Sequence, residues 1–234
     1  MPASLGAATR WVWSQSLEFV YPSRCFGCDE EGSFICLVCI TQLSKADPPR
    51  CPRCWSLRTA EDCRSCPSLR HLDGVRSGFI HQGLAREAVI QLKYGGVFSA
   101  GPEMGKRLAE ALAGWTGGAE VVVPVPLHSS RERSRGYNQA RKLAEGFAAR
   151  VGLPLEPGLL RRKKRTRSQA AGLNYEARLE NVRDAFETSG RAQGRRIALV
   201  DDVVTTTATM QACALALKSA GAASVSGVSF TREG

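Results

Sequence analysis

Eight of the nine cysteines form four Cys-x-x-Cys pairs within the first 66 residues, separated by gaps of 7, 11 and 8 residues. A Cys-x-x-Cys turn directs two thiolates at one point, and two such turns complete a tetrahedral four-sulfur shell around Zn²⁺. Eight ligands therefore predict two zinc ions. The pairs are Cys25/Cys28, Cys36/Cys39, Cys51/Cys54 and Cys63/Cys66.

Zinc explains these pairs better than other thiol chemistry does. A disulfide framework needs an oxidising compartment, whereas the N-terminal sequence has no recognisable export signal, so we expect a cytoplasmic protein. A thioredoxin-like site needs one pair on a βαβ unit, not four in tandem. Four sulfur ligands leave no open coordination position, so both ions are expected to be structural. The spacing favours two sequential ribbons, but a cross-braced arrangement, joining first pair with third and second with fourth, stays open.

The stretch IALVDDVVTTTATM (197–210) combines a hydrophobic strand, two adjacent carboxylates and a run of threonines. Ligands of open α/β sheets bind at the carboxyl ends of the strands, where Asp201 and Asp202 could accept hydrogen bonds from vicinal ribose hydroxyls. The threonines lead into a helix, and a helix N-terminus offers free N–H groups and a positive dipole end to a phosphate. The stretch therefore predicts a phosphosugar site.

Other interpretations of this stretch fit less well. Asp and Thr also cap helices, but one cap does not explain two acids and four threonines. A phosphoacceptor receiver domain needs most of its length after the acidic pair, and only 32 residues follow Asp202. A Walker-type phosphate loop requires Gly-x-x-x-x-Gly-Lys-Ser/Thr, and the sequence contains no such string.

The net charge of +10 is concentrated in one part of the chain. Residues 128–183 hold 14 basic and 5 acidic residues, a density that favours an anionic partner such as phosphate, pyrophosphate or nucleic acid. A solvated face that keeps the protein soluble is the alternative. Hydrophobic residues at 43% argue against disorder, and no apolar run approaches the ~20 residues of a membrane span.

The composition changes near residue 70, which predicts a Cys-rich domain at 1–70 and a second domain at 71–234. In the second domain, strand, helix and strand follow one another within the last third, which implies a parallel βαβ unit. We therefore expect a doubly wound α/β domain. Helices are predicted at 83–93, 103–113, 138–150, 174–182 and 208–219. Strands are predicted at 119–126, 185–188, 197–200 and 224–230.

The segment VDDVVTTTAT (200–209) resembles the phosphoribosyl pyrophosphate (PRPP) motif of type I phosphoribosyltransferases. The chain as a whole resembles the ComF competence-protein family, which joins an N-terminal double zinc ribbon to such a domain. Four further segments carry this resemblance: FVYPSRCFGC (19–28), QLKYGG (91–96), VPVPLHSSRERSRGYNQA (123–140) and TRSQAAGLNYEARLENVRDAF (166–186).

The resemblance implies a type I phosphoribosyltransferase-like fold and assigns roles to individual residues. Asp201 and Asp202 would be the catalytic pair that holds the ribose hydroxyls, and Thr205 to Thr209 would hold the 5-phosphate. PRPP, with Mg²⁺, would lie along Asp201, Asp202, Val203, Val204, Thr205, Thr206, Thr207, Ala208 and Thr209. Candidates for the diphosphate are Arg131, Arg133 and Arg135. The basic segment 161–172 corresponds to a mobile hood, with Arg165, Arg167 and Gln169 as its contacts.

Thr207 departs from the family pattern, which usually has glycine after the second threonine. Glycine tolerates a positive φ or a close approach to phosphate, and a β-branched residue resists both. Two functional hypotheses follow from the resemblance. The first is a Mg²⁺-dependent transferase that displaces pyrophosphate from PRPP, with an unidentified acceptor. The alternative is a non-catalytic PRPP sensor or a module of natural transformation that binds single-stranded DNA or competence proteins.

Overall fold

The computed structural model describes residues 22–57, 63, 66, 69–163 and 185–233. The chain divides into two compact units between Gln42 and Leu43. Residues 43–70 thus group with the α/β core, whereas the domain boundary expected from composition lies at residue 70 and stays a prediction. The expected helix at 174–182 and most of the expected hood lie outside the described residues, and so do Arg165, Arg167 and Gln169.

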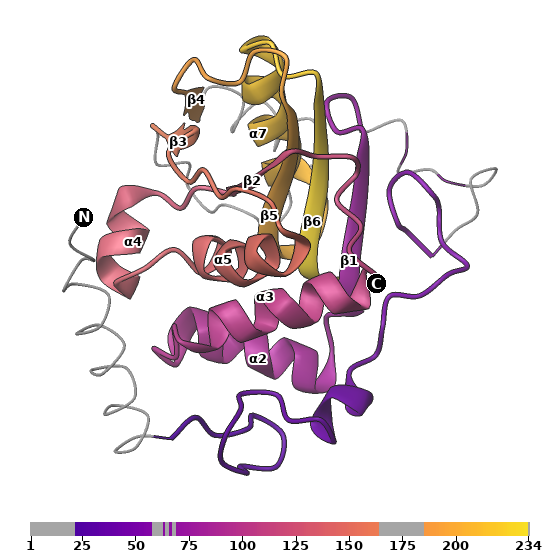
Figure 1. The fold of residues 1–234 in the computed structure, drawn as a ribbon, viewed down its shortest axis with the longest axis vertical. Coiled ribbons are helices and arrows are strands. Elements are labelled where there is room, and N and C mark those ends of the chain that lie inside the picture. Colours follow the sequence, from indigo (N-terminus) through magenta and orange to yellow (C-terminus); the bar gives the residue numbers. More distant parts are fainter. Residues whose placement is uncertain (1–21, 58–62, 64–65, 67–68, 164–184, 234) are drawn as a thin grey trace, which may run out of the picture. The chain divides into compact units, whose positions relative to one another are not determined.

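Four parallel strands form the sheet of the second unit, in the order β1-β6-β5-β2 (Figure 1). They are β1 (Gly74–Ile80), β2 (Val121–Pro124), β5 (Arg196–Val204) and β6 (Ser224–Arg232). The parallel register, with Val121 opposite Ile197, confirms the predicted α/β class. The expectation that strand 197–200 ends before the acidic pair is wrong, because backbone pairing continues through Asp201, which lies opposite Ser229.

Helices cover both faces of the sheet (Figure 1). A Cβ on Gly78 would meet Leu108 of α3 (Ala100–Ala111), whereas one on Gly227 would meet Met210 of α7 (Ala208–Ser219). Gly78 of β1 lies opposite Phe230 of β6, and Phe230 is three residues after Gly227. Because side chains alternate between the two faces along a strand, an odd separation places Gly78 and Gly227 on opposite faces, so α3 and α7 pack on opposite faces of the sheet. The other long helices are α2 (Gly83–Tyr94) and α5 (Gln139–Val151).

The direction of the chain reverses between β2 and β5. After α5, Leu155 pairs in parallel with Val122 on the edge of β2 away from β5. From β5, by contrast, the chain passes through α7 to β6, on the other side. This is the topological switch point of a doubly wound sheet, and the crevice outside the carboxyl ends of β2 and β5 is where such folds bind ligands.

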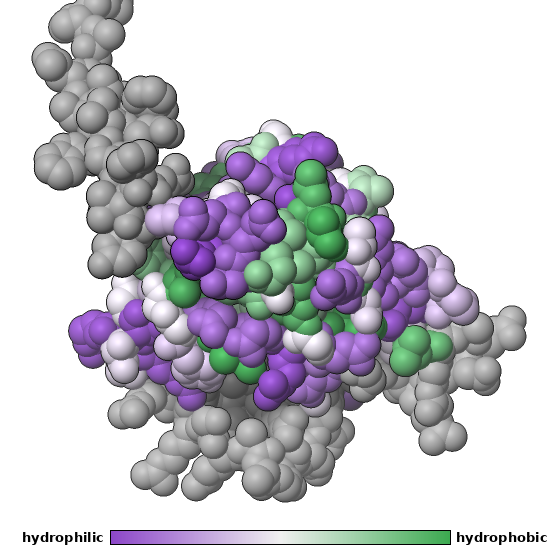
Figure 2. All heavy atoms as spheres, turned by 90° about the horizontal axis from the view of Figure 1, so that it is seen from below, coloured by the Kyte–Doolittle hydropathy of each residue, from purple (hydrophilic) through white to green (hydrophobic). Residues whose placement is uncertain are grey.

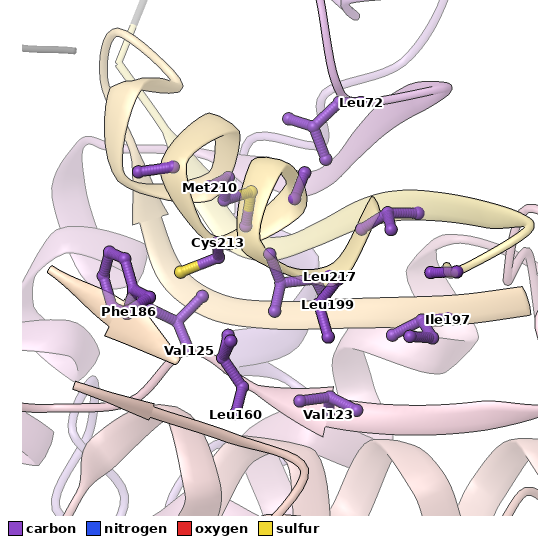
Figure 3. Close-up of a cluster of buried hydrophobic side chains, with 14 of the residues drawn as sticks. Leu72, Val123, Val125, Leu160, Phe186, Ile197, Leu199, Met210, Cys213 and Leu217 are labelled. Atoms are coloured by element: carbon purple, nitrogen blue, oxygen red, sulfur yellow. The ribbon is translucent and has the colours of Figure 1, made fainter. Parts of the chain in front are cut away.

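Figure 3 shows the core between α7 and the sheet, where Leu217 of α7 lies next to Leu199 of β5. Met210 and Cys213 of α7 belong to the same buried cluster. Cys213 is fully buried, which confirms its prediction as a small hydrophobic core residue. A short antiparallel ribbon also contributes to this cluster, through strands β3 (Leu160–Arg162) and β4 (Phe186–Thr188). β4 was predicted, while β3 occupies the start of the segment expected to be the hood.

Some large hydrophobic side chains reach the surface. Figure 2 shows hydrophobic residues among hydrophilic ones on the face seen from below. Within the described part of the chain, no helix is long and apolar enough to cross a membrane. The exposed large hydrophobic residues are Leu37, Val38, Leu57, Tyr94 and Phe98.

Candidate functional site

The second half of β5 carries both acidic residues of the predicted site. Asp202 is buried and points toward the helices on one face of the sheet. Gln139, at the start of α5, donates from Nε2 to Asp202 Oδ1 at 3.2 Å. Lys93, in the last turn of α2, forms an ion pair with Asp202 Oδ2. Two helices that follow different strands therefore converge on one carboxylate.

Asp201 has a different electrostatic environment. As its neighbour in a strand, it points to the opposite face from Asp202, and its Oδ1 accepts a hydrogen bond of 2.9 Å from the Asp202 backbone N–H. Burial, followed by the negative charge of Asp202, raises the pKa of Asp201 well above its ordinary value. The two acids are therefore unequal: one has an ion-pair partner, and the other retains a proton more readily.

Thr207 adopts a left-handed conformation, with φ 61° and ψ −4°, immediately before α7. Its hydroxyl donates to the Thr206 carbonyl at 2.6 Å, while Thr205 and Thr206 are exposed. The turn therefore has the backbone shape that glycine would adopt easily, even though a β-branched residue occupies the position. The first N–H groups of α7 have no intrahelical acceptors and follow directly after this turn.

The expected diphosphate loop is partly helical. Residues after β2 form α4 (Ser129–Arg135), which His128 caps by accepting from the Ser130 backbone N–H. Arg131 and Arg133 are exposed on it. Arg135 donates to Gln139 Oε1, which connects it through Gln139 to Asp202. Among the three candidate diphosphate arginines, the described hydrogen bonds thus connect Arg135 to Asp202.

A cavity of about 300 Å³ opens beside the carboxyl end of β2. Its walls combine apolar residues, including Pro124 and Leu160, with polar and charged ones, among them Glu132, Arg141 and Arg162. Burial lowers the pKa of Arg162, and the charge of Asp201 opposes this shift. Arg162 therefore lies within electrostatic range of Asp201, on the β2 side of the switch point.

Sequence reasoning missed Lys93 and Gln139 as site residues. Both lie in segments that carried the family resemblance, QLKYGG and GYNQA. A lysine in the last turn of a helix is ordinarily explained by its favourable interaction with the helix dipole. No sequence spacing or repeat connects Lys93 or Gln139 with Asp202. The neighbouring Asn138 is buried and fixes α5, because its amide donates to Val125 O and its Oδ1 accepts from the Ala140 N–H.

Eight of the nine cysteines form two groups of four, and within each group all Sγ atoms lie within 4.8 Å of one another. This grouping confirms the sequential arrangement, and the cross-braced alternative is wrong. Backbone N–H groups of Cys36 and Cys39 donate to thiol sulfurs at 3.4 Å, as suits metal-bound thiolates. The all-sulfur donor set fits Zn²⁺. The groups are Cys25, Cys28, Cys36 and Cys39, then Cys51, Cys54, Cys63 and Cys66.

The second cysteine group is anchored to the α/β core by arginines. The Arg76 guanidinium of β1 lies 4.1 Å from the ring centroid of Trp55 and 4.8 Å from that of Trp115. Arg232, at the end of β6, donates to the Cys54 carbonyl at 2.9 Å. Since Cys51 and Cys54 also belong to the core cluster, this cysteine group and the sheet form one packed structure.

No family model matches the chain. The competence protein ComFC of Streptococcus pneumoniae is 27% identical over 206 residues, covering 86% of this chain and 89% of that protein. The DNA utilization protein YhgH of Escherichia coli is 29% identical over 206 residues, covering 82% and 87%. This chain resembles the ComF proteins. The predicted family resemblance is thereby confirmed over most of the ComF-like chain.

Higher identity occurs over a shorter stretch. Competence protein F of Haemophilus influenzae is 35% identical over 105 residues, so the aligned part spans 44% of the ComF-like chain and 45% of that relative. Among solved structures, the chain is similar to a glutamine PRPP amidotransferase of Bacillus subtilis complexed with ADP and GMP. That alignment has 25% identity and a TM-score of 0.40, and covers 56% of this chain and 26% of the other.

Proposed function

We propose that this chain binds PRPP, or a related phosphosugar, together with Mg²⁺ at the carboxyl ends of β2 and β5. The observation that carries the proposal is the Asp201–Asp202 pair followed by Thr207 in a left-handed turn before α7. Carboxylates that can accept ribose hydroxyls then stand next to a helix N-terminus that suits phosphate. Both lie at the switch point, where doubly wound sheets bind ligands.

Each part of the ligand has a group of matching chemistry. The Asp pair accepts hydrogen bonds from the ribose hydroxyls, and the backbone from Val203 to Thr209 surrounds the 5-phosphate. Arg131, Arg133 and Arg135 supply positive charge for the diphosphate, while Mg²⁺, when bound with PRPP, neutralises the charge that develops there. As part of the same proposal, Arg165, Arg167 and Gln169 contact the ligand from the hood.

The reaction that this arrangement serves is phosphoribosyl transfer. The bond from ribose C1 to the diphosphate oxygen breaks, a bond from C1 to the acceptor nucleophile forms, and pyrophosphate leaves with the bonding electron pair. Positive charge around the leaving group stabilises the transition state. We also propose that both cysteine groups hold Zn²⁺ as structural ions, because their four-sulfur shells leave no open position for substrate.

The names of the relatives suggest the setting of this chemistry. Of the three relatives described above, two are named competence proteins and one a DNA utilization protein. We propose a cytoplasmic role for this chain in the uptake or use of DNA. The exposure of Arg131 and Arg133 favours a second candidate, in which the chain binds single-stranded DNA or competence proteins and senses PRPP without turnover.

Calorimetric titration with PRPP and Mg²⁺ tests the binding site. We expect micromolar binding by the zinc-loaded chain, and a loss of at least tenfold in affinity for Asp202→Asn. Because this substitution also removes the ion pair with Lys93, circular dichroism must show that the variant is folded, and Asp201→Asn serves as the second variant. Absence of binding by the folded wild-type chain would refute the proposal, while release of pyrophosphate with a nucleophile present would separate the enzyme from the sensor.

A further inference from the structure

Exposed aromatic side chains lie next to the candidate phosphosugar site. Tyr94 is 76% exposed and Phe98 is 54% exposed. They flank the turn between α2 and α3: Tyr94 lies in the QLKYGG segment, and Phe98 lies two residues after it. Neither residue contributes to the core, although both would bury a large apolar area if they did. Their exposure therefore leaves two aromatic faces available for a ligand.

The turn between these aromatics requires glycine. Gly96 has φ +73°, a conformation that other residues adopt only with strain. A Cβ on Gly95 would lie 2.1 Å from Gln91 Oε1 and 3.0 Å from the Gln91 carbonyl. The paired glycines thus allow α2 to end directly after Tyr94 and bring Phe98 to the other side of a short turn.

Two further side chains complete this group. The ring centroids of Phe98 and Tyr137 lie 5.7 Å apart, and the Tyr137 hydroxyl donates to the Leu92 carbonyl, which fixes its ring. The Arg135 guanidinium lies 5.2 Å from the Tyr94 ring centroid. Three aromatic rings and one cation therefore form a single surface group, which we term the aromatic group: Tyr94, Phe98, Arg135 and Tyr137.

The aromatic group is connected to Asp202 by two routes. Tyr94 follows Lys93, which forms the ion pair with Asp202, and Arg135 donates to Gln139, which donates to Asp202. The exposed guanidinium groups of Arg131 and Arg133 lie on the same helix as Arg135. A ligand on the aromatic group thus has cationic groups beside it and the candidate ribose site next to it.

We propose that the aromatic group is a stacking site for a nucleobase. Bases stack on exposed aromatic rings irrespective of sequence, and arginines beside such rings hold the phosphates of a single strand. Arg135 adds a cationic face that interacts with π-systems. Two sources share this chemistry: a base within single-stranded nucleic acid, and a free base that would accept the phosphoribosyl group. The second source rests on the proposed transferase function, and the first deepens the second candidate function, in which the chain binds single-stranded DNA.

The test uses the full-length, zinc-loaded chain and a fluorescently labelled 20-nucleotide oligothymidine, without PRPP or Mg²⁺, read by fluorescence anisotropy. We expect Tyr94→Ala to weaken binding by about fivefold or more, and Tyr94→Phe, which keeps the ring, to bind like the wild type. Leu57→Ala, which removes another exposed hydrophobic side chain (65% exposed), is the matched control. Arg133→Ala should lower the salt dependence of binding, and Tyr94→Ala should leave it unchanged.

A second titration measures free thymine and free adenine by calorimetry with the same variants. Loss of oligonucleotide affinity in Tyr94→Ala identifies a strand as the source, and loss confined to a free base identifies an acceptor. If neither probe binds, or if Tyr94→Ala and Leu57→Ala bind both probes equally, the stacking site is refuted. The PRPP affinity of Tyr94→Ala, measured separately, should equal that of the wild type. Failure of the stacking site can therefore be distinguished from failure of the PRPP site.

Discussion

At the scale of single residues, the acidic pair shows how one strand separates two identical side chains into different chemical states. Asp202 has Lys93 and Gln139 as partners. Asp201 instead has a raised pKa, because desolvation and the neighbouring negative charge of Asp202 disfavour its charged form. Adjacent carboxylates are usually expected to act together on one ligand. Here the ion-paired Asp202 and the proton-retaining Asp201 should interact differently with hydroxyls and cations.

Asp201→Asn should therefore stabilise the folded chain. Because the pKa of Asp201 is raised on folding, the unfolded chain loses this proton first, so stability falls as pH rises from ~3.9, the ordinary value. The loss is complete above the raised pKa. Asparagine removes this cost, so Tm of the variant should exceed that of the wild type at pH 8, and the difference should shrink toward pH 3.5.

Thermal unfolding of both chains at the two pH values provides the measurement. Asp202→Asn is the matched control and should lower Tm at pH 8, since it leaves the Lys93 ammonium without its partner. Equal Tm shifts for both variants would contradict the inequality of the two acids.

At the scale of elements, the junction between β5 and α7 stores conformational strain at Thr207. A residue with a Cβ in the left-handed region costs about 1–2 kcal/mol relative to a right-handed conformation. Glycine at 207 would remove this strain, although greater freedom of the unfolded chain offsets part of the gain. We expect Thr207→Gly to stabilise the chain by up to about 1 kcal/mol and to bind PRPP at least as tightly.

Denaturant unfolding measures the first expectation, and calorimetry measures the second. Thr205→Gly is the control, because Thr205 is not among the residues described with positive φ, and it should destabilise. A Thr207→Gly chain that is less stable than the wild type would show that the threonine hydroxyl, which donates to Thr206 O, outweighs the strain.

Elements were predictable where their apolar residues repeat, and not elsewhere. The α2, α5 and α7 patterns gave correct helices because each buries one face against the sheet or a neighbouring helix. α4 has no buried residue, so it carries no apolar period, and its cap at His128 is recognisable only once its helix is known. β1 was missed because Gly74 and Gly78 interrupt its hydrophobic pattern, at positions that face Trp115 and Leu108.

The candidate site was predictable only in part for a related reason. The acidic pair and the threonines are contiguous in sequence, and the cysteine pairs have a recognised spacing. Lys93 and Gln139 reach Asp202 from two other helices, and only the folded sheet brings these three residues together. The sequence likewise contained Tyr94 and Phe98 without indicating that they are exposed.

At the scale of the whole molecule, the two cysteine groups should differ in their effect on the α/β core. Cys51 is buried in the core cluster, and Arg232 and Arg76 connect its group to β6 and β1. Structural zinc contributes on the order of 10 kcal/mol of folding free energy in small sites. We expect Cys51→Ser to lower the Tm of the α/β unit strongly and to change tryptophan fluorescence.

Metal analysis and thermal unfolding test this expectation together. The wild-type chain should contain two Zn²⁺, and Cys51→Ser and Cys25→Ser should each contain one. Cys25→Ser should leave the main unfolding transition nearly unchanged, since Cys25 belongs to the other compact unit. Equal destabilisation by the two substitutions, or retention of both ions, would contradict these assignments.

The position of β6 in the sheet also has a consequence for how the chain reaches its native state. β6 is the latest of the four strands in chain order, yet it lies between β1 and β5, and the Ser77–Ser229 hydrogen bond joins residues 152 apart. Contacts between such distant residues slow folding, because a long loop must close before they form. During synthesis, β1 therefore waits for its neighbour until nearly the whole α/β unit has been translated, and its unpaired edge makes this interval the one in which chaperone protection matters most.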